Sequence, residues 1–332
     1  MSKNFSLFGL FFAAISVFIW GITFVSTKYL LLSFSSYEIL VLRFLLAYAG
    51  LWALRPGLLR LSDKRCEIYF LLAGFSGVTS YQFMENMAIA YTSASNVSII
   101  VSICPIFTAI FLQIFLKERH LTMYFNVGFL LAIFGVALVS FNGVVEFHMN
   151  PKGDVLAFCA ALCWGVYSVC VSKINALRLD SIQATRRIFF WAVIFMLPIG
   201  IFSLTRFCGV DASAVGTTAV GTSAVGTTAD AQILENIRLI FDKTVNLRRF
   251  SNPLNLLNLA FLGLGASAFC FVAWNVACEK LGTVRATVGI YLIPVVTIVF
   301  AFFALGEKIS LMGAVGAVLT IAGLFVSEIK KN

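Results

Sequence analysis

Long apolar runs recur along this chain, and their length limits the fold more than any other feature. Residues 8–31 contain a single charged side chain, Lys28, and comparable runs follow to the end of the sequence. A helix of roughly 20 apolar residues crosses the hydrocarbon core of a bilayer. Because 60% of the 332 residues are apolar and only 12% are charged, a water-soluble fold could not hide these runs. The sequence predicts an all-α membrane protein.

Ten transmembrane helices are predicted from the runs. Ten spans of roughly 20 residues account for about 200 apolar residues, which matches the apolar content of the chain. The runs exclude a soluble enzyme and a disordered chain, and an outer-membrane barrel is disfavoured because its strands alternate in polarity. The predicted spans are approximately 8–31, 38–54, 68–90, 94–116, 122–141, 154–172, 188–204, 254–279, 283–305 and 309–328.

The cysteines and histidines indicate no metal site and no cofactor. Six of the eight cysteines fall inside apolar runs, and no CxxC pair occurs. The two histidines, His120 and His148, are far from any cysteine cluster. A metal site needs such side chains at close spacing, so the cysteines are interpreted as small apolar helix residues.

The cations predict the orientation of the chain in the membrane. The net charge is +9, but the cations lie in short clusters on alternate connections, which favours contact with anionic lipid over a nucleic-acid partner. With a cytoplasmic N-terminus, the inside connections carry 15 cations, and the short outside connections carry little beyond Lys28, Lys152 and Lys308. Loops on the cytoplasmic side of a membrane protein carry an excess of Lys and Arg. An inner-membrane protein with both termini cytoplasmic is predicted.

Matching residues recur in the two halves of the chain. Trp20-Gly21 matches Trp164-Gly165, and Arg43 matches Arg187, both 144 residues later. Later matches lie 188 or 189 residues apart. They include Asn86 with Asn275, Pro105 with Pro294, Gly128 with Gly316 and Gly135 with Gly323. The change in offset, from 144 to 189, is 45 residues and locates an insertion between the seventh and eighth spans.

The insertion, at about 203–253, has an unusual composition. Residues 214–228 are three tandem copies of Ala-Val-Gly-Thr-Thr/Ser, which have no large side chains to build a core. Residues 233–250 mix apolar and basic residues, which would suit a surface helix. The loop is expected outside the membrane, and a tolerated insertion is favoured over a role in chemistry.

Each half contains five predicted helices, residues 1–148 and 149–332. Because five is odd, the second copy must cross the membrane in the opposite sense, as an inverted repeat. Inverted repeats place an equivalent opening on each face, which is the basis of alternating access. The pattern favours a carrier over an enzyme or a receptor.

The motifs resemble the EamA family of the drug/metabolite transporter superfamily. The resemblance rests on Trp20-Gly21, Leu42-Arg43-Phe44, the segment 88–94, Lys117-Glu118-Arg119 and Gly306-Glu307-Lys308, in order and partly in duplicate. It covers nearly the whole chain except 203–253. It implies secondary transport of small metabolites, often the export of amino acids or related compounds, and leaves the individual substrate open.

Three charged residues within the spans are candidates for a gate. Lys28, Arg43 and Glu85 are expected at similar depth in the outer third of the bundle. Charges inside a bilayer are costly and need a reason. Glu85 is predicted to pair with Lys28 or Arg43 and to close the outer side, or else to carry a coupling proton. The alternative is structural: Lys28 reaches the interface and Arg43 binds helix-end carbonyls.

Polar and aromatic residues within the spans are candidates for the substrate cavity. Amphipathic rings, amides and hydroxyls can hydrogen-bond a solute and stack on its flat parts, although Trp and Tyr also anchor helices at the interface and Ser and Thr join helices. The candidates are Trp20, Thr23, Ser80, Tyr81, Asn86, Ser102, Trp164, Tyr167, Trp274, Asn275 and Tyr291.

The positions of two prolines and four glycines suggest hinges and close contacts between helices. Pro105 and Pro294 lie near the middle of their predicted spans, where a proline kinks a helix, so they are candidate hinges or fixed bends. Gly128 and Gly135, and their mates 188 residues later, share a helix face and favour close packing, including packing within a homodimer.

Two other functions remain to be weighed. One is an uptake carrier for a nucleotide-like metabolite such as S-adenosylmethionine, which the abundant aromatic residues would also suit. The other is a membrane-embedded transferase, which needs clustered Asp, Glu or His. The predicted spans offer one clear buried acid, Glu85, and no histidine, which disfavours the transferase.

Overall fold

The structure is a computed structural model that describes residues 7–117, 122–140, 151–207, 247–305 and 311–327. These residues form helices, with no strand among them, which confirms the all-α class. Several predicted features lie outside the described residues: both termini, the tandem repeats, most of the surface helix at 233–250, and the acids of the two connection motifs, Glu118 and Glu307.

The helices of the first half follow the predicted spans. They are α1 (Leu7–Leu30), α2 (Ser36–Leu54), η1 (Lys64–Cys66), α3 (Glu67–Ala73), η2 (Gly74–Ser80), α4 (Tyr81–Tyr91), α5 (Ala94–Val101), α6 (Cys104–Leu116) and α7 (Met123–Ser140). The segments α3, η2 and α4 follow one another without a break, and η2 is π-helical.

The helices of the second half follow in the same order. They are α8 (Pro151–Ala176), α9 (Ser181–Phe207), η3 (Leu247–Phe250), α11 (Pro253–Ala260), η4 (Phe261–Phe269), α12 (Cys270–Leu281), α13 (Thr283–Val288), η5 (Gly289–Leu292), α14 (Ile293–Leu305) and α15 (Leu311–Ser327). The segment η4 is also π-helical and lies between two α-helical segments, as η2 does. Helix α9 begins seven residues before the predicted span (188 − 181), because the Asp180 carboxylate accepts hydrogen bonds from the backbone of Ile182 and Gln183.

Six helical stretches of the described chain are long and apolar enough to cross a membrane. They are Leu7–Leu30, Ser36–Leu54, Val97–Leu116, Pro151–Ala176, Pro253–Leu281 and Thr283–Ala304. Large apolar side chains such as Phe11, Phe18, Leu130 and Phe303 are exposed on the outside of the bundle. A surface of this kind is suited to lipid and not to water.

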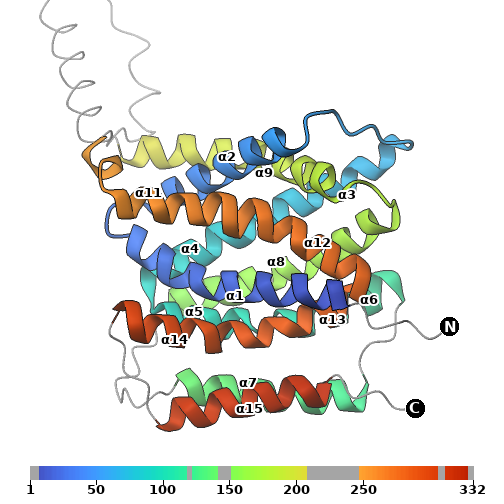
Figure 1. The fold of residues 1–332 in the computed structure, drawn as a ribbon, viewed down its shortest axis with the longest axis vertical. Helices are drawn as coiled ribbons and strands as arrows, with labels where there is room; N and C mark the ends of the chain where they lie inside the picture. The colour runs from blue at the N-terminus through green and yellow to red at the C-terminus, as the bar shows by residue number, and fades with distance from the viewer. Residues whose placement is uncertain (1–6, 118–121, 141–150, 208–246, 306–310, 328–332) are drawn as a thin grey trace, which may run out of the picture.

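The long helices run roughly side by side across the bundle (Figure 1). Helix α1 packs between α12 and α14, while α2 and α9 lie together along one edge. Helices α7 and α15 pack on each other at the opposite edge. Helix α1 begins and α15 ends at the same end of the bundle (Figure 1).

Ion pairs tie connections together at each end of the bundle. Where α2 begins, the Arg249 Nη2 lies 2.5 Å from the Glu38 carboxylate, and the Arg249 guanidinium also lies over the Phe34 ring. Where α9 begins, Arg187 donates two hydrogen bonds of 2.8 Å to the Glu67 carboxylate. Two-pronged pairs of this kind are the stronger class of ion pair.

Glycine allows α7 and α15 to approach closely. A Cβ atom placed on Gly128 would lie 2.4 Å from the backbone nitrogen of Ser327, and one on Gly323 would lie 2.5 Å from that of Ala132. Gly135, seven residues after Gly128, contacts Thr320, seven residues before Ser327. The two helices are therefore antiparallel. The predicted close packing of these glycines is present within one chain.

We expect Gly323→Ala to destabilise the protein by about 1–3 kcal/mol, because the added methyl group meets backbone atoms that cannot turn away. Thermal unfolding in detergent measures the effect. The matched control is Gly265→Ala in η4, where a Cβ would make an ordinary contact of 3.6 Å with Phe261. Equal losses in the two variants would contradict this interpretation of the packing.

Candidate functional site

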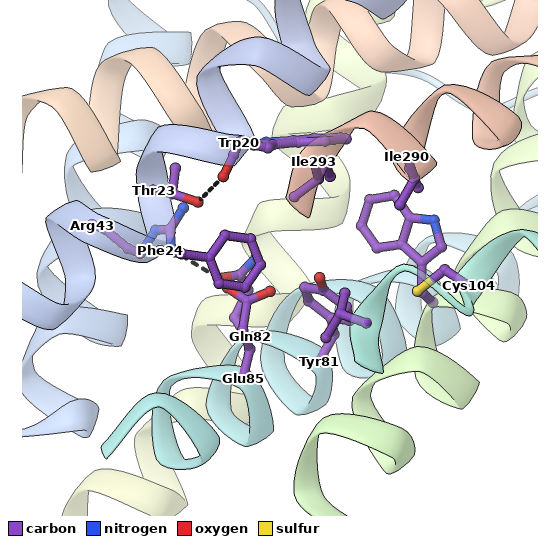
Figure 2. A pocket seen from close by; sticks show the side chains of 12 residues that line it. Trp20, Thr23, Phe24, Arg43, Tyr81, Gln82, Glu85, Cys104, Ile290 and Ile293 are labelled. Atoms are coloured by element: carbon purple, nitrogen blue, oxygen red, sulfur yellow. Dashed lines mark hydrogen bonds between the residues drawn. The ribbon is translucent and has the colours of Figure 1, made fainter. Parts of the chain in front are cut away.

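A small cavity lies inside the bundle, where α1, α2, α4 and α8 meet the broken helices α5–α6 and η5–α14. Its volume is about 20 Å³, which is room for about one water molecule. Its lining combines charged, amide, aromatic and aliphatic side chains (Figure 2). The lining residues are Trp20, Thr23, Phe24, Arg43, Tyr81, Gln82, Glu85, Val101, Cys104, Trp164, Ile290 and Ile293.

The cavity brings together six of the residues singled out from the sequence. Four are aromatic or polar candidates for the lining, and two are charged candidates for the gate. They are Trp20, Thr23, Tyr81, Trp164, Arg43 and Glu85. They come from four different helices, so their meeting depends on the tertiary structure.

The sequence missed the other half of the lining. Phe24, Val101, Cys104, Ile290 and Ile293 are apolar, and nothing in a sequence separates an apolar cavity residue from an apolar core residue. Gln82 did carry a signal: it is an amide within a span, three residues before Glu85, so both lie on one helix face.

The remaining polar candidates join helices in this conformation. Asn86 and Ser36 exchange two hydrogen bonds, of 3.2 and 3.3 Å, between α4 and α2. The Tyr167 hydroxyl donates to Asn275 Oδ1 at 3.4 Å, and the Asn275 amide donates to Thr185 at 2.9 Å. Such bonds are typical of membrane helix interfaces. A role for Asn86, Tyr167 and Asn275 in binding solute stays a prediction.

Four further candidates do not line the cavity, although each is a neighbour of a residue that does. Ser102 donates a hydrogen bond of 2.6 Å to the carbonyl of Ile99, three residues earlier, and Ser80 is half-buried at the end of η2. Tyr291 is buried in a second, smaller apolar cluster. The Trp274 ring packs on the Trp20 ring with 4.9 Å between centroids. Their contact with solute likewise stays a prediction.

Aromatic rings form part of the lining of the cavity. The Trp20 and Trp164 rings meet edge to face at 5.4 Å, and Tyr81 lies 5.1 Å from Trp164. The Trp20 indole N–H donates to the Ala266 carbonyl at 3.0 Å. By contrast, Trp164 is 3% exposed and its indole N–H has no hydrogen-bond acceptor among the described residues. A buried donor without an acceptor is costly, and a role for this N–H in binding solute stays a prediction.

Arg43 places a buried positive charge at the cavity. Its side chain is 1% exposed. The guanidinium donates from Nε to the Ser267 hydroxyl at 3.0 Å and from Nη1 to the Gln82 side-chain oxygen at 2.8 Å. Both acceptors are neutral, and they come from α4 and η4. The bonds fix the direction of the guanidinium but do not neutralise its charge.

Glu85 lines the same cavity and is 4% exposed. Figure 2 shows Arg43, Gln82 and Glu85 on one side of the cavity, with Cys104 and Ile290 on the other. Among the ion pairs of the described residues, none joins Glu85 to Arg43. The cavity therefore contains one acid and one base that are close to each other without direct contact, and their pairing in a gate stays a proposal.

Lys28 binds helix-end carbonyls. Its Nζ donates to the backbone oxygens of Ile89 and Thr92, at 2.8 and 2.9 Å, where α4 ends. The alternative to a gate predicted that Arg43 would bind helix-end carbonyls. In the structure Lys28 binds them. Cations stabilise a helix C-terminus because the last carbonyls have no partner within the helix.

Pro105 and Pro294 lie at equivalent breaks beside the cavity. Pro105 is the second residue of α6 after the end of α5, and Pro294 is the second residue of α14 after η5. A proline is tolerated in the first turn of a helix, where its missing N–H is not needed. Each break borders two lining residues, Val101 and Cys104 in one case and Ile290 and Ile293 in the other. A hinge role for the two prolines stays a prediction.

A helical membrane bundle with charged and aromatic side chains around an interior cavity is the architecture of a solute transporter. Comparison with protein families agrees. The chain belongs to the EamA-like transporter family, whose model matches residues 7–141 and 233–328. Family and relatives are transporters and not enzymes.

Individual relatives carry transporter names. An uncharacterized transporter of Archaeoglobus fulgidus is 26% identical over 96% of both chains. A probable terminal-alkyne amino-acid exporter of Streptantibioticus cattleyicolor is 25% identical over 77% of this chain and 71% of its own length. A solved crystal structure of a protein matches with a TM-score of 0.64 at 16% identity, covering 96% of both chains, which shows a shared fold.

We expect Cys104, kept as the sole cysteine, to react with a water-soluble thiol reagent only when the cavity opens. An amino acid at roughly ten times its Kd occupies about 90% of the sites, so labelling should slow about tenfold. Mass spectrometry of the labelled protein measures both rates. The control keeps Cys170, which is buried in α8 and does not line the cavity. If every transported amino acid left Cys104 labelling unchanged, the cavity would not be the binding site.

Proposed function

We propose that this protein is a secondary transporter of the inner membrane that moves small organic metabolites, amino acids or related compounds, outward by alternating access. The observation that carries the proposal is the cavity inside the helical bundle, which is lined by Arg43, Glu85 and four aromatic rings. An interior acid and base in a membrane protein are functional candidates, because burying them costs stability.

We further infer that ten spans form two inverted five-helix repeats, residues 1–148 and 149–332. Reciprocal contacts support a twofold relation. Gly21 of the first half packs against Val296 of the second, and Gly165 of the second packs against Phe107 of the first. Gly21 and Gly165 are 144 residues apart, and Phe107 and Val296 are 189 apart, the same offsets as in the sequence.

A second pair of contacts follows the same rule. Gly74 in α3–η2 packs against α9, and Gly263 in η4 packs against Arg43 and Leu46 of α2. A twofold axis between the halves requires contacts to come in exchanged pairs of this kind. The family model also matches in two stretches, residues 7–141 in the first half and residues 233–328 in the second.

Alternating access requires that one end of the bundle opens while the other stays closed. The small cavity and the ion pairs at the two ends support a conformation closed on both sides. With the N-terminus in the cytoplasm, the Glu38–Arg249 pair is outside and the Glu67–Arg187 pair is inside. The beginning of α1 and the end of α15 at one end of the bundle support two cytoplasmic termini.

The substrate class rests on the cavity and on one relative. The Streptantibioticus relative is named a probable terminal-alkyne amino-acid exporter, which supports amino acids as substrates and export as the direction. Uptake of a nucleotide-like solute is the second candidate, and the Trp20, Tyr81 and Trp164 rings favour it because they would suit a flat base. Proton coupling through Glu85 and a homodimer remain predictions.

Transport by purified protein in liposomes tests the proposed function. We expect one or more labelled amino acids to cross the membrane, and S-adenosylmethionine to compete poorly. An imposed pH gradient and the Glu85→Gln variant test coupling: a coupled carrier loses its response to the gradient in the variant. Failure of a broad amino-acid panel together with movement of S-adenosylmethionine would replace the first candidate by the second.

We expect the two ion pairs to bias the carrier in opposite directions. Glu67→Gln should favour opening of the cavity inward, and Glu38→Gln should favour opening outward, each by about 1–2 kcal/mol, because a charge-assisted bond is lost. Labelling of Cys104 by an impermeant reagent, added to one side of the membrane at a time, measures the bias.

The control for both variants is Glu279→Gln, whose partner Lys280 is its exposed neighbour in the sequence. Surface pairs of this kind contribute little. The control should therefore leave labelling from both sides unchanged. A shift of Glu67→Gln and Glu38→Gln in the same direction would contradict the assignment of the two pairs to opposite gates.

A further inference from the structure

We propose that Arg43 binds the carboxylate of the transported solute, that Glu85 receives its ammonium group, and that Gln82 and Ser267 position the guanidinium for this contact. The proposal deepens the proposed function and rests on it. It assigns the solute a chemical form, a zwitterion with neighbouring acidic and basic groups, and it adds Gln82 to the residues that determine specificity.

The geometry of Arg43 leaves part of its guanidinium available. An arginine side chain has five N–H donors in a planar fork. The two hydrogen bonds of Arg43 use Nε and one hydrogen of Nη1. Nη2 makes no hydrogen bond with the described residues, and the side chain lines the cavity. The available edge can bind a carboxylate through two parallel bonds, the strongest contact that such a fork makes.

The charge of Arg43 also needs a partner. A buried guanidinium in a membrane is costly unless an anion compensates it, and its two hydrogen-bond acceptors are neutral. Glu85 is close enough to line the same cavity, yet it forms no ion pair with Arg43. A solute that carries one negative and one positive group can satisfy both side chains at once.

The aromatic lining of the cavity fits the ammonium group. Trp20, Tyr81 and Trp164 line the same cavity as Glu85. An ammonium group is attracted both to a carboxylate and to the faces of aromatic rings. The indole N–H of Trp164, which has no acceptor among the described residues, offers a further hydrogen bond to an oxygen of the solute.

The far side of the cavity indicates where the rest of the solute lies. Cys104 and Ile290 lie across the cavity from Arg43 and Glu85 (Figure 2), and Ile293 also lines it. An amino acid bound through its charged groups would direct its side chain toward these apolar residues. An apolar side chain fits this environment, so leucine is a suitable probe. The cavity of about 20 Å³ must widen to admit it.

The acceptors of Arg43 hold it from two different segments. Gln82 lies in α4 and Ser267 in η4, while Arg43 itself lies in α2. Gln82 therefore acts through Arg43 as a positioning residue. Loss of its side-chain oxygen should weaken the binding of a carboxylate and should leave the binding of an uncharged group at the same place unchanged.

A comparison of three probes tests the proposal in proteoliposomes. Leucine carries both charges, leucinamide lacks the carboxylate, and isopentylamine keeps only the amine and the side chain. We expect leucine to be transported with a half-saturating concentration at least about tenfold lower than that of the other two, the effect of one charge-assisted bidentate contact. This comparison needs no variant, so it stands even if a substitution prevents folding.

Variants then assign the effect to Arg43. Arg43→Lys keeps the charge but loses the fork, so we expect the preference for leucine over leucinamide to fall about tenfold. Gln82→Met, which keeps the length and removes the oxygen, should raise the half-saturating concentration for leucine and leave the maximal rate unchanged. Arg187→Lys is the matched control: Arg187 is the repeat mate of Arg43 and binds Glu67 outside the cavity, so the preference should persist.

The outcomes separate this proposal from the proposed function. Equal transport of leucine and leucinamide by the wild type would overturn the carboxylate contact and leave the transporter assignment intact. A full preference for leucine in Arg43→Lys would also overturn it. Failure of the wild type to move any amino acid would overturn the proposed substrate class, and this proposal with it.

Discussion

The hydrogen bonding of the backbone inside a bilayer is the constraint on which this structure depends. No water is available there, so each segment must satisfy its own N–H and C=O groups, and the described residues do this by forming helices. Departures from the regular α-helix, at η2, η4 and the breaks before α6 and α14, occur where neighbouring helices cover them. The breaks at Pro105 and Pro294 border the cavity.

Burial of charge is the second constraint. The protein keeps Arg43 and Glu85 inside the bundle, each almost fully buried, and gives Arg43 only neutral partners. In a purely structural role, the acid and the base would be expected to pair directly. Both side chains line one cavity, beside an indole N–H without an acceptor among the described residues, and this is an arrangement that a zwitterionic solute would complete.

Small residues set how closely the helices approach one another. Glycines of α7 and α15 bring two backbones into contact, and glycines of α1, α8, η2 and η4 do the same between the halves. In a membrane there is little hydrophobic force between helices, so close packing and interhelical hydrogen bonds hold the bundle. The exchanged pairs of these contacts support a twofold relation between the halves, which alternating access would require.

The sequence by itself determined the membrane class, the family and the approximate spans, because apolar run length and repeated motifs are local properties of the chain. It also identified Arg43, Glu85, Trp20 and Trp164 as candidates for a gate or a cavity, because charged and amphipathic residues are unusual within a span. Only the tertiary structure decided which candidates meet. Asn86, Tyr167 and Asn275 join helices, Lys28 binds the end of α4, and Gln82 holds Arg43. Those roles depend on rotations and contacts of helices far apart in the sequence, which no local pattern records.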